Sequence, residues 1–307
     1  MKVLILGSNG LVGTSVKNVL ERNPNIEELI CATRNDADLF NFGETKELIE
    51  NSKPDIMINA AAKVGGIYAN NSKRTEFILE NLKINVNILE ASIPFPEMYI
   101  INLGSSCIYP LEADNPIKEE SVMSGRLEPT NSPYAMAKLT AIEIGDALSN
   151  QYGHKVLNIM PTNLYGPFDN FSENDSHVIP GLIGKMHKAK KQKAEEFKIW
   201  GTGKPLREVL YVDEVGEACE YFLRKKTNSH LINIGSRTEK TIKDFAKKVR
   251  KKIDPSVNIK FDNNKKLDGV KRKKLDINLA KKYGWKSKMN FDETLEMTIE
   301  DFKRKYC

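Results

Sequence analysis

The segment "GSSCIYP", residues 104–110, places a thiol among hydroxyl groups. Ser105, Ser106, Cys107 and Tyr109 follow the apolar run "MYIIN", which is typical of a buried strand. A strand that ends in three hydroxyl groups and one thiol presents several groups able to donate, accept or remove a proton. This pattern predicts that one or more of these side chains contact a substrate.

The stretch "YAMAK" separates Tyr134 from Lys138 by four residues. On a helix this spacing puts both side chains on one face. An ammonium group near a phenol stabilises the phenolate, so we expect Lys138 to lower the pKa of Tyr134 from its ordinary value of about 10. Tyr134 would then be a proton donor for a carbonyl oxygen. Taken alone, the spacing is common, and a surface tyrosine–lysine pair is the alternative.

The sequence "GSNGLVG" spaces three glycines by three residues, between a strand-like run and a helix-like run. Glycine lets the backbone turn tightly and approach a pyrophosphate, whose charge then lies at the positive helix N-terminus. The loop therefore predicts a dinucleotide site, although three glycines can also fall in a turn by chance. The predicted cofactor-binding residues of this loop are Gly7, Ser8, Asn9, Gly10, Leu11, Val12 and Gly13.

The end of the second strand-like run indicates which dinucleotide binds. A carboxylate there suits the ribose hydroxyl of NAD, whereas an arginine suits the 2′-phosphate of NADP. The run "ICATRND" offers Thr33 and Arg34, with Asp36 two residues on. We therefore predict NADP(H) as the cofactor and Arg34 as a contact to it.

The elements that must position these groups alternate along the first half of the chain. Short apolar runs such as "KVLILG", "DIMINAAA" and "MYIINLGSS" are separated by longer amphipathic stretches. This rhythm predicts an α/β fold with a doubly wound parallel Rossmann sheet. We expect an NADP-binding Rossmann domain over residues 1–166, with returning segments near 205–236. A smaller, non-contiguous substrate-binding domain is expected over residues 167–307.

Composition favours an ordinary globular protein that acts on small molecules. Of the 307 residues, 40% are apolar and 29% charged, and no apolar run approaches the roughly 20 residues of a membrane span. The N-terminus enters a strand directly, without a cleavage site, so we expect a cytoplasmic protein that does not bind membranes. The net charge of +6 lies mainly in lysine-rich runs without interleaved aromatic residues, which favours solvated helix faces or small phosphate ligands over nucleic acid.

The cysteines form no cluster with metal-ligand spacing. They are Cys31, Cys107, Cys219 and Cys307, far apart in the sequence. Neither a disulfide framework nor a metal site is predicted.

Longer stretches of the chain resemble a known family. They include "NAAAKVGGIYANN", "LGSSCIYP", "LEPTNSPYAMAK", "MPTNLYGPFDNF", "SHVIP", "IWGTGKPLRE" and "LDGVKRKKLD". The sequence resembles the extended short-chain dehydrogenase/reductases and, within them, the GDP-L-fucose synthase family. The resemblance implies 3,5-epimerisation of GDP-4-keto-6-deoxy-D-mannose followed by NADPH-dependent reduction at C4, in a homodimer.

The resemblance also implies catalytic roles for five residues. Ser105, Tyr134 and Lys138 are the expected reductase triad, with Ser105 holding the C4 carbonyl oxygen. Removal of protons next to a ketone gives an enolate, which needs electrostatic stabilisation together with a base and an acid on opposite faces. Cys107 as base and His177 as acid fit this requirement, since their ordinary pKa values of roughly 8.5 and 6.5 can shift toward neutrality. From the residues alone, a packed cysteine and a histidine bonded to backbone are the alternatives.

Further contacts follow from the same resemblance. The additional cofactor-binding residues are Leu103, Gly104, Ser106, Lys138, Pro161, Thr162, Asn163 and Leu164. The substrate-binding residues are Lys185, Trp200, Arg207, Asp268 and Lys273. The chain departs from the family at two positions, because Lys185 and Asn9 stand where members commonly have arginine.

Two other functions remain open at this stage. One is another NAD(P)-dependent nucleotide-sugar epimerase/reductase of the same superfamily, which would lack the pair Cys107 and His177. The other is a non-catalytic dinucleotide-sensing Rossmann protein. The presence of Tyr134 and Lys138 favours an enzyme.

Overall fold

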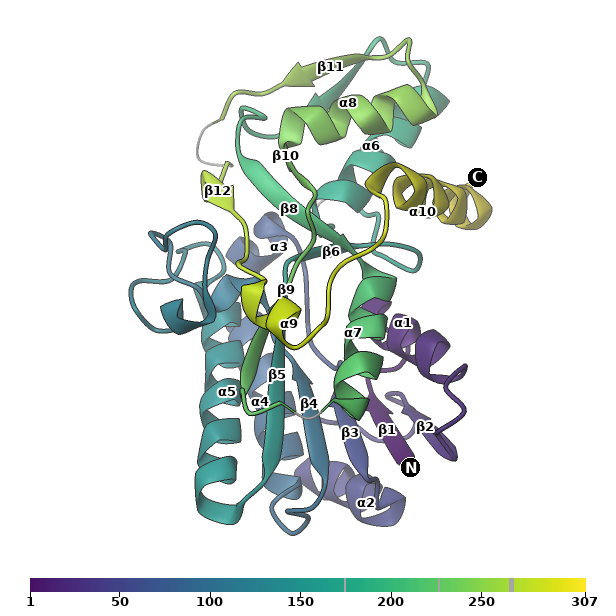
Figure 1. The fold of residues 1–307 in the computed structure, drawn as a ribbon. Coiled ribbons are helices and arrows are strands. Elements are labelled where there is room, and N and C mark those ends of the chain that lie inside the picture. Colours follow the sequence, from purple (N-terminus) through teal and green to yellow (C-terminus); the bar gives the residue numbers. More distant parts are fainter. Residues whose placement is uncertain (174, 226, 265–267) are drawn as a thin grey trace.

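A six-stranded parallel sheet forms the larger half of the molecule (Figure 1). The computed structural model describes residues 1–173, 175–225, 227–264 and 268–307. The strand order is β2-β1-β3-β4-β5-β9, so the chain starts inside the sheet, moves to one edge and returns past its start. The strands are β1 (Lys2–Leu6), β2 (Glu28–Ala32), β3 (Ile56–Asn59), β4 (Tyr99–Leu103), β5 (Lys155–Pro161) and β9 (Leu231–Ile234). This confirms the predicted doubly wound Rossmann sheet, in which ligands bind where the strand order reverses.

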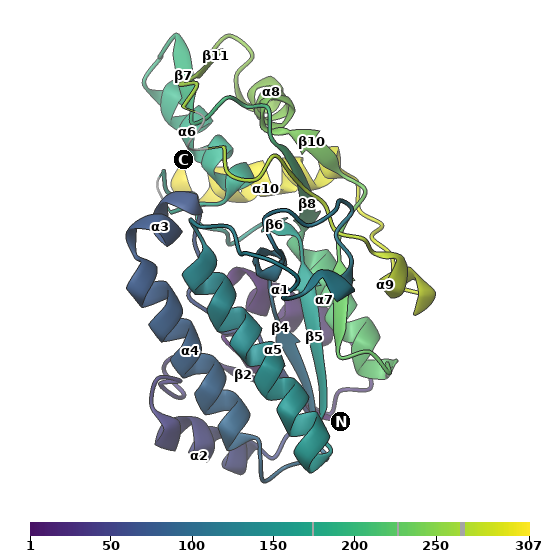
Figure 2. The same cartoon turned by 90° about the vertical axis from the view of Figure 1, so that its left-hand side faces the viewer.

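Helices cover both faces of this sheet (Figures 1 and 2). Alternation along β1 explains how, since Val3 and Ile5 face one core while Leu4 and Leu6 face the other. The first core includes residues of α1 (Leu11–Leu20) and α7 (Val212–Arg224). The second includes residues of α2 (Phe42–Ser52), α4 (Arg74–Ala91) and α5 (Ser132–Tyr152).

A row of buried asparagines crosses the large sheet. Asn59, Asn102 and Asn158 are register partners on β3, β4 and β5. The amide of Asn59 donates to Asn102 and that of Asn102 donates to Asn158, each at 3.0 Å. A buried amide left without a partner is costly, so this ladder favours one register of the three strands that lead to the candidate site.

A smaller half lies above the carboxyl ends of the strands (Figure 1). It contains a sheet with β6 (Asn163–Tyr165), β8 (Leu206–Tyr211), β10 (Glu239–Thr241) and β12 (Arg272–Lys273), and a pair formed by β7 (Glu196–Ile199) and β11 (Asn258–Phe261). Its helices α6 (Val178–Lys191), α8 (Ile242–Ile253) and α10 (Phe291–Tyr306) enclose a separate apolar core. The segment 205–236 is shared, because α7 and β9 pack with the large sheet and β8 with the small one.

Three short helices complete the described structure. These are α3 (Ile67–Ser72), η1 (Ser106–Ile108) and α9 (Asn278–Lys282), with a further turn η2 (Glu119–Ser121). Within the described ranges, none of the helices combines the length and apolar character that crossing a membrane requires.

Candidate active site

The glycine turn joins β1 to α1 and brings the helix close to the strand. Gly7 has φ 77°, a left-handed conformation that favours glycine. A Cβ on Gly13 would lie 2.1 Å from the Gly7 carbonyl oxygen, and one on Gly7 would lie 2.7 Å from Ala61 Cα. A Cβ on Gly10, the N-cap of α1, would have only the Gly7 carbonyl oxygen nearby, at 3.5 Å. Gly7 and Gly13 thus permit the packing, while Gly10 leaves the helix N-terminus open, as a bound pyrophosphate requires.

Two other residues of the turn lie outside the cavity described below. The backbone N–H and hydroxyl of Ser8 both donate to the Ala32 carbonyl at 3.1 Å, which ties the turn to β2. Ser8 therefore anchors the loop, and its donors are not free for a ligand. Asn9 is exposed at the tip.

After β2, the side chains of Arg34 and Asp36 have different surroundings. Asp36 Oδ2 accepts hydrogen bonds from the backbone N–H and the hydroxyl of Thr33, both at 2.8 Å. These bonds, led by the backbone one, lower the pKa of Asp36. Arg34 is exposed, and no described residue forms a hydrogen bond or ion pair with its side chain. The free cation and the occupied carboxylate favour a phosphate over a ribose hydroxyl at this position.

One large cavity, with a volume of about 640 Å³, lies between the two halves. It brings together twenty of the predicted site residues, which are Gly10, Leu11, Val12, Leu103, Gly104, Ser105, Ser106, Cys107, Tyr134, Lys138, Pro161, Thr162, Asn163, Leu164, His177, Lys185, Trp200, Arg207, Asp268 and Lys273. The other five, Gly7, Ser8, Asn9, Gly13 and Arg34, do not line it. Sequence reasoning missed Tyr68, Glu128 and Asn131, which also line the cavity.

Ser105 organises the turn that carries the thiol. It is the N-cap of η1, and its hydroxyl oxygen accepts the backbone N–H of Cys107 at 3.2 Å. The short helix directs Ser105, Ser106 and Cys107 into the cavity immediately after β4. The Ser105 side chain also hydrogen-bonds Tyr134, so a ligand carbonyl oxygen that enters the cavity beside both residues could take the place of the phenol as acceptor of the serine hydroxyl hydrogen.

Tyr134 and Lys138 are both buried on α5, with 8% and 3% of their surfaces exposed. The Lys138 ammonium donates to the Leu103 carbonyl at 2.7 Å, and burial lowers its pKa to about 8. Burial also raises the pKa of Tyr134 well above its usual value; the nearby Cys107 raises it further, and a hydrogen bond with Ser105 opposes the shift. The predicted lowering of the Tyr134 pKa by Lys138 is therefore wrong for the protein without ligands, because desolvation of the phenolate dominates.

Cys107 lies between the two halves of the protein. Asn131, in the loop before α5, donates its side-chain amide to the Cys107 sulfur at 3.5 Å. Lys273, on β12, donates its ammonium group to the same sulfur, also at 3.5 Å. The Glu128 carboxylate accepts the backbone N–H of Asn131 at 3.2 Å and so orients that residue.

His177 is the N-cap of α6 and faces the same cavity. Burial lowers its pKa. Its ring makes no hydrogen bond to any described residue, whereas its backbone carbonyl accepts the Gly181 N–H at 2.9 Å. The ring is thus free to exchange a proton with a ligand.

Arg207 is 7% exposed and mainly binds backbone. Its guanidinium donates to the carbonyls of Leu206 at 2.9 Å, Val270 at 2.6 Å and Asp268 at 2.8 Å. Three of its five N–H donors are therefore used, and two of them hold the segment 268–270 against β8. The expected bidentate fork toward a diphosphate is already largely engaged in this structure.

Asp268 and Lys185 hold Trp200 at the mouth of the cavity. Both carboxylate oxygens of Asp268 accept hydrogen bonds from Thr202, at 2.7 and 2.8 Å, which fixes the loop after Trp200. The Lys185 ammonium lies 3.6 Å from the centre of the Trp200 ring, and the ring of Tyr68 lies 6.2 Å away on the other half of the protein. Burial lowers the pKa of Lys185, opposed by Glu173 and Asp262.

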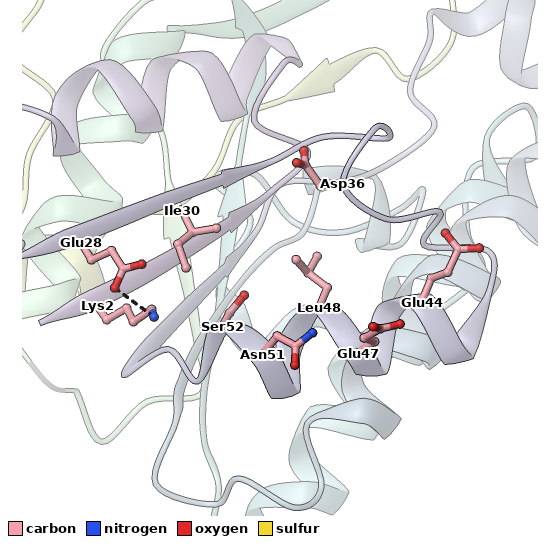
Figure 3. A pocket seen from close by; sticks show the side chains of 9 residues that line it. All are labelled: Lys2, Glu28, Ile30, Asp36, Glu44, Glu47, Leu48, Asn51 and Ser52. Carbon is pink, nitrogen blue, oxygen red and sulfur yellow. Dashed lines mark ion pairs between the residues drawn. The ribbon is translucent and has the colours of Figure 1, made fainter.

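A second hollow, of about 400 Å³, lies beside β2 and α2 (Figure 3). Figure 3 shows Glu44, Glu47 and Asn51 along α2 on one side of the hollow, and on the other side Glu28 and Lys2, which form an ion pair at 2.9 Å. Its remaining lining residues are Ile30, Asp36, Leu48 and Ser52. Carboxylates dominate this hollow, so its charge disfavours phosphate groups. Among the described residues no cluster suited to a metal ion is found.

The sheet order, the glycine turn and a tyrosine–lysine pair facing one cavity define a dinucleotide-dependent enzyme of the extended short-chain dehydrogenase/reductase class. The chain belongs to the NAD dependent epimerase/dehydratase family, whose model matches residues 3–235.

Relatives that match nearly the full chain are named GDP-L-fucose synthase or synthetase. GDP-L-fucose synthase 1 of Arabidopsis thaliana is 37% identical over 306 residues, covering 100% of this chain and 94% of its own. GDP-L-fucose synthase of Escherichia coli strain K12 is 36% identical over 310 residues, covering 98% and 96%. The crystal structure of a GDP-L-fucose synthetase from Naegleria fowleri bound to NADP has a TM-score of 0.90 at 26% identity, covering 99% and 94%.

Proposed function

We propose that the protein converts GDP-4-keto-6-deoxy-D-mannose to GDP-L-fucose, by 3,5-epimerisation and then reduction at C4. The observation that carries this proposal is the meeting of Ser105, Cys107, Tyr134, Lys138 and His177 in one cavity. The full-length relatives named GDP-L-fucose synthase support the same reaction.

Epimerisation needs a base, an acid and a site for developing negative charge on oxygen. In our proposal the Cys107 thiolate removes the proton from C3 or C5, and Ser105 and Tyr134 donate hydrogen bonds to the enolate oxygen at C4. Protonated His177 then returns a proton to the opposite face of the same carbon. Proton loss from the thiol and proton uptake by the imidazole, both through solvent, restore the starting state.

Reduction uses a different part of the same site. When bound, NADPH supplies a hydride to C4. Tyr134, which burial keeps protonated, delivers its proton to the C4 oxygen. The Lys138 ammonium, held on the Leu103 carbonyl, then lies four residues away on the same helix to stabilise the phenolate that remains.

In our proposal the cofactor binds along the carboxyl ends of the first strands. The open N-terminus of α1 at Gly10 suits the pyrophosphate, and exposed Arg34 suits the 2′-phosphate of NADP(H). Leu103, Gly104 and Pro161, with the residues next to them, line the same cavity as Tyr134 and would help to hold the nicotinamide end of the cofactor.

The nucleotide part of the substrate occupies the outer half of the cavity in this proposal. Lys185, Arg207 and Lys273 supply positive charge toward a diphosphate, and the Trp200 ring supplies a flat apolar face at the mouth. Asp268 acts indirectly, since Thr202 occupies both of its oxygens.

The test is product analysis with the purified protein. Incubation of GDP-4-keto-6-deoxy-D-mannose with NADPH in D₂O should yield GDP-L-fucose with deuterium at C3 and C5, read by NMR. Reduced product with protium at both positions and unchanged configuration would show a simple 4-reductase and contradict the proposal. Failure of the purified protein to oxidise NADPH in the presence of this substrate would contradict the proposal as well.

We also infer a homodimer through α4 and α5. These helices lie side by side on one face of the large sheet, and Leu79 and Met136 on them are about half exposed. Two such faces would bury these side chains against each other. Sedimentation equilibrium of the wild-type protein and of the Leu79→Lys variant tests this, since only the wild type should be dimeric.

A further inference from the structure

Cys107 receives two hydrogen bonds at its sulfur, from Asn131 and from Lys273. A thiol sulfur is a weak acceptor, whereas an ammonium group has three donors and no acceptor capacity. Two donors that converge on one sulfur from different segments therefore match a thiolate better than a thiol. The lysine is 166 residues away in the sequence, on the other half of the protein.

The short strand β12 explains why Lys273 reaches this position. Alternate residues of a strand point to opposite sides. Arg272 forms a two-point ion pair with Glu239 at 2.7 and 2.8 Å, and Lys274 lies 3.8 Å from the same carboxylate. Lys273, between them, turns the other way into the cavity, where no described carboxylate pairs with it. Its described partner is the Cys107 sulfur alone.

The other ionisable groups that face the thiol are neutral or have other electrostatic partners. Arg207 faces Cys107 from β8, but Asp268 and Glu128 are its stronger electrostatic partners, and backbone carbonyls hold its guanidinium. Tyr134 faces the thiol from α5 and stays neutral. His177, from α6, lines the same cavity. A half-buried ammonium without a carboxylate is unfavourable unless another anion accompanies it, and Cys107 is the group placed to be that anion.

We propose that Lys273 is a positioning residue whose ammonium group maintains Cys107 as a thiolate before the substrate arrives. Formation of the pair releases the thiol proton to solvent. When the thiolate takes a proton from carbon, the sulfur becomes neutral and the ammonium is free to face the substrate diphosphate. The role in epimerisation rests on the proposed function, whereas the ion pair in the free protein does not.

Alkylation of the free protein tests the pair without any substrate. Iodoacetamide reacts with thiolates, so its rate at Cys107 reports the thiolate fraction. Rates would be measured by peptide mass spectrometry from pH 6 to pH 10 for wild type, Lys273→Met, Lys273→Arg and the control Lys271→Met. Lys271 is exposed and two residues from Lys273. Exposed Cys307 serves as an internal reference in every sample.

The expected result is selective loss of reactivity at Cys107. Lys273→Met should slow its alkylation at pH 7 by on the order of tenfold, because an opposite charge within hydrogen-bond distance favours the ionised form. The rates should converge at pH 10, where the thiol ionises unaided. Lys273→Arg and Lys271→Met should react at near the wild-type rate, and Cys307 should be unaffected throughout.

Three outcomes overturn the proposal. Equal Cys107 rates for wild type and Lys273→Met at every pH would mean that the ammonium does not stabilise the thiolate. A uniform slowing that persists at pH 10 would mean that the substitution limits access. A raised KM for the nucleotide sugar with unchanged alkylation would make Lys273 only a diphosphate ligand. Deuterium incorporation by the unmodified enzyme separately tests the proposed reaction, so the two failures are distinguishable.

Discussion

Arg207 on β8 donates a hydrogen bond to the backbone carbonyl of Asp268 at 2.8 Å. Through this contact a side chain of one strand holds a segment that lies 61 residues further along the chain. Asp268 in turn fixes the Thr202 loop next to Trp200. One buried guanidinium thus supports both the mouth of the cavity and the segment that leads to β12.

This relationship changes what loss of Arg207 should do. Resemblance alone predicts a raised KM with kcat largely kept, the signature of uniform substrate binding. Arg207→Ala also removes three hydrogen bonds from a charged donor, so we expect the free energy of unfolding to fall by about 2–4 kcal/mol. Urea unfolding and steady-state kinetics measure the two effects. Exposed Arg237→Ala is the matched control and should change neither.

Epimerisation and reduction should separate at Cys107. Serine at this position preserves size but is a far weaker base, and loss of a positioned base typically costs about 10²–10⁴-fold. Cys107→Ser should exchange few C3 and C5 protons with D₂O and release little fucose-configured product. NADPH oxidation should persist slowly on the unepimerised ketone, because neither the hydride nor the Tyr134 proton involves the thiol. Epimerisation by this variant at the wild-type rate would reduce Cys107 to a packing role.

Replacement of His177 should have the opposite signature. His177→Asn should allow deuterium exchange yet give poor inversion, since proton removal on one face continues without delivery from the other. Burial lowers the pKa of His177 from its ordinary value of about 6.5. The protonated imidazole is therefore lost at a lower pH than for an exposed histidine. Inversion by the wild type should therefore decline with rising pH before deuterium exchange does. NMR time courses from pH 5.5 to 8 compare the two, and parallel declines would count against His177 as the acid.

Cofactor preference should depend on Arg34. Its exposed guanidinium has no described partner, while Thr33 occupies the neighbouring Asp36 carboxylate. Arg34→Ala should raise the KM for NADPH more than that for NADH. Asn9→Arg, at the exposed tip of the glycine turn, is the reciprocal variant and should lower the KM for NADPH. Equal catalytic efficiencies of the unmodified protein with both cofactors would refute the assignment.

Lys138 should destabilise the fold in a pH-dependent way. Its pKa is about 8 in the folded protein, against about 10.4 for a free lysine, so the unfolded chain binds more protons between these values. Stability attributable to Lys138 therefore rises with pH from 8 to about 10 and is lowest below 8. The Tm of wild type relative to Lys138→Met should increase over this window, equivalent to about 3 kcal/mol at most. A pH-independent difference in Tm would contradict the shift.

The described sheet and the glycine turn could be predicted from the sequence because they depend on local pattern. Apolar runs of strand length separated by amphipathic runs leave few arrangements other than a doubly wound sheet. Three glycines at the end of the first strand place a helix N-terminus beside β1 and β3, where the strand order reverses. The spacing of Tyr134 and Lys138 similarly required only a helix.

Contacts between distant segments could not be predicted in this way. No local pattern indicates that Lys273 meets Cys107, that the guanidinium of Arg207 binds backbone, or that Asn131 lies at the thiol. The position of Asn131 just before the helix of Tyr134 was the only available signal for it. The direction of the Tyr134 pKa shift was also out of reach, because it depends on how completely the folded chain excludes water from the phenol. Residue types and spacing determined which reactions were possible, whereas packing between the two halves decided which groups carry charge.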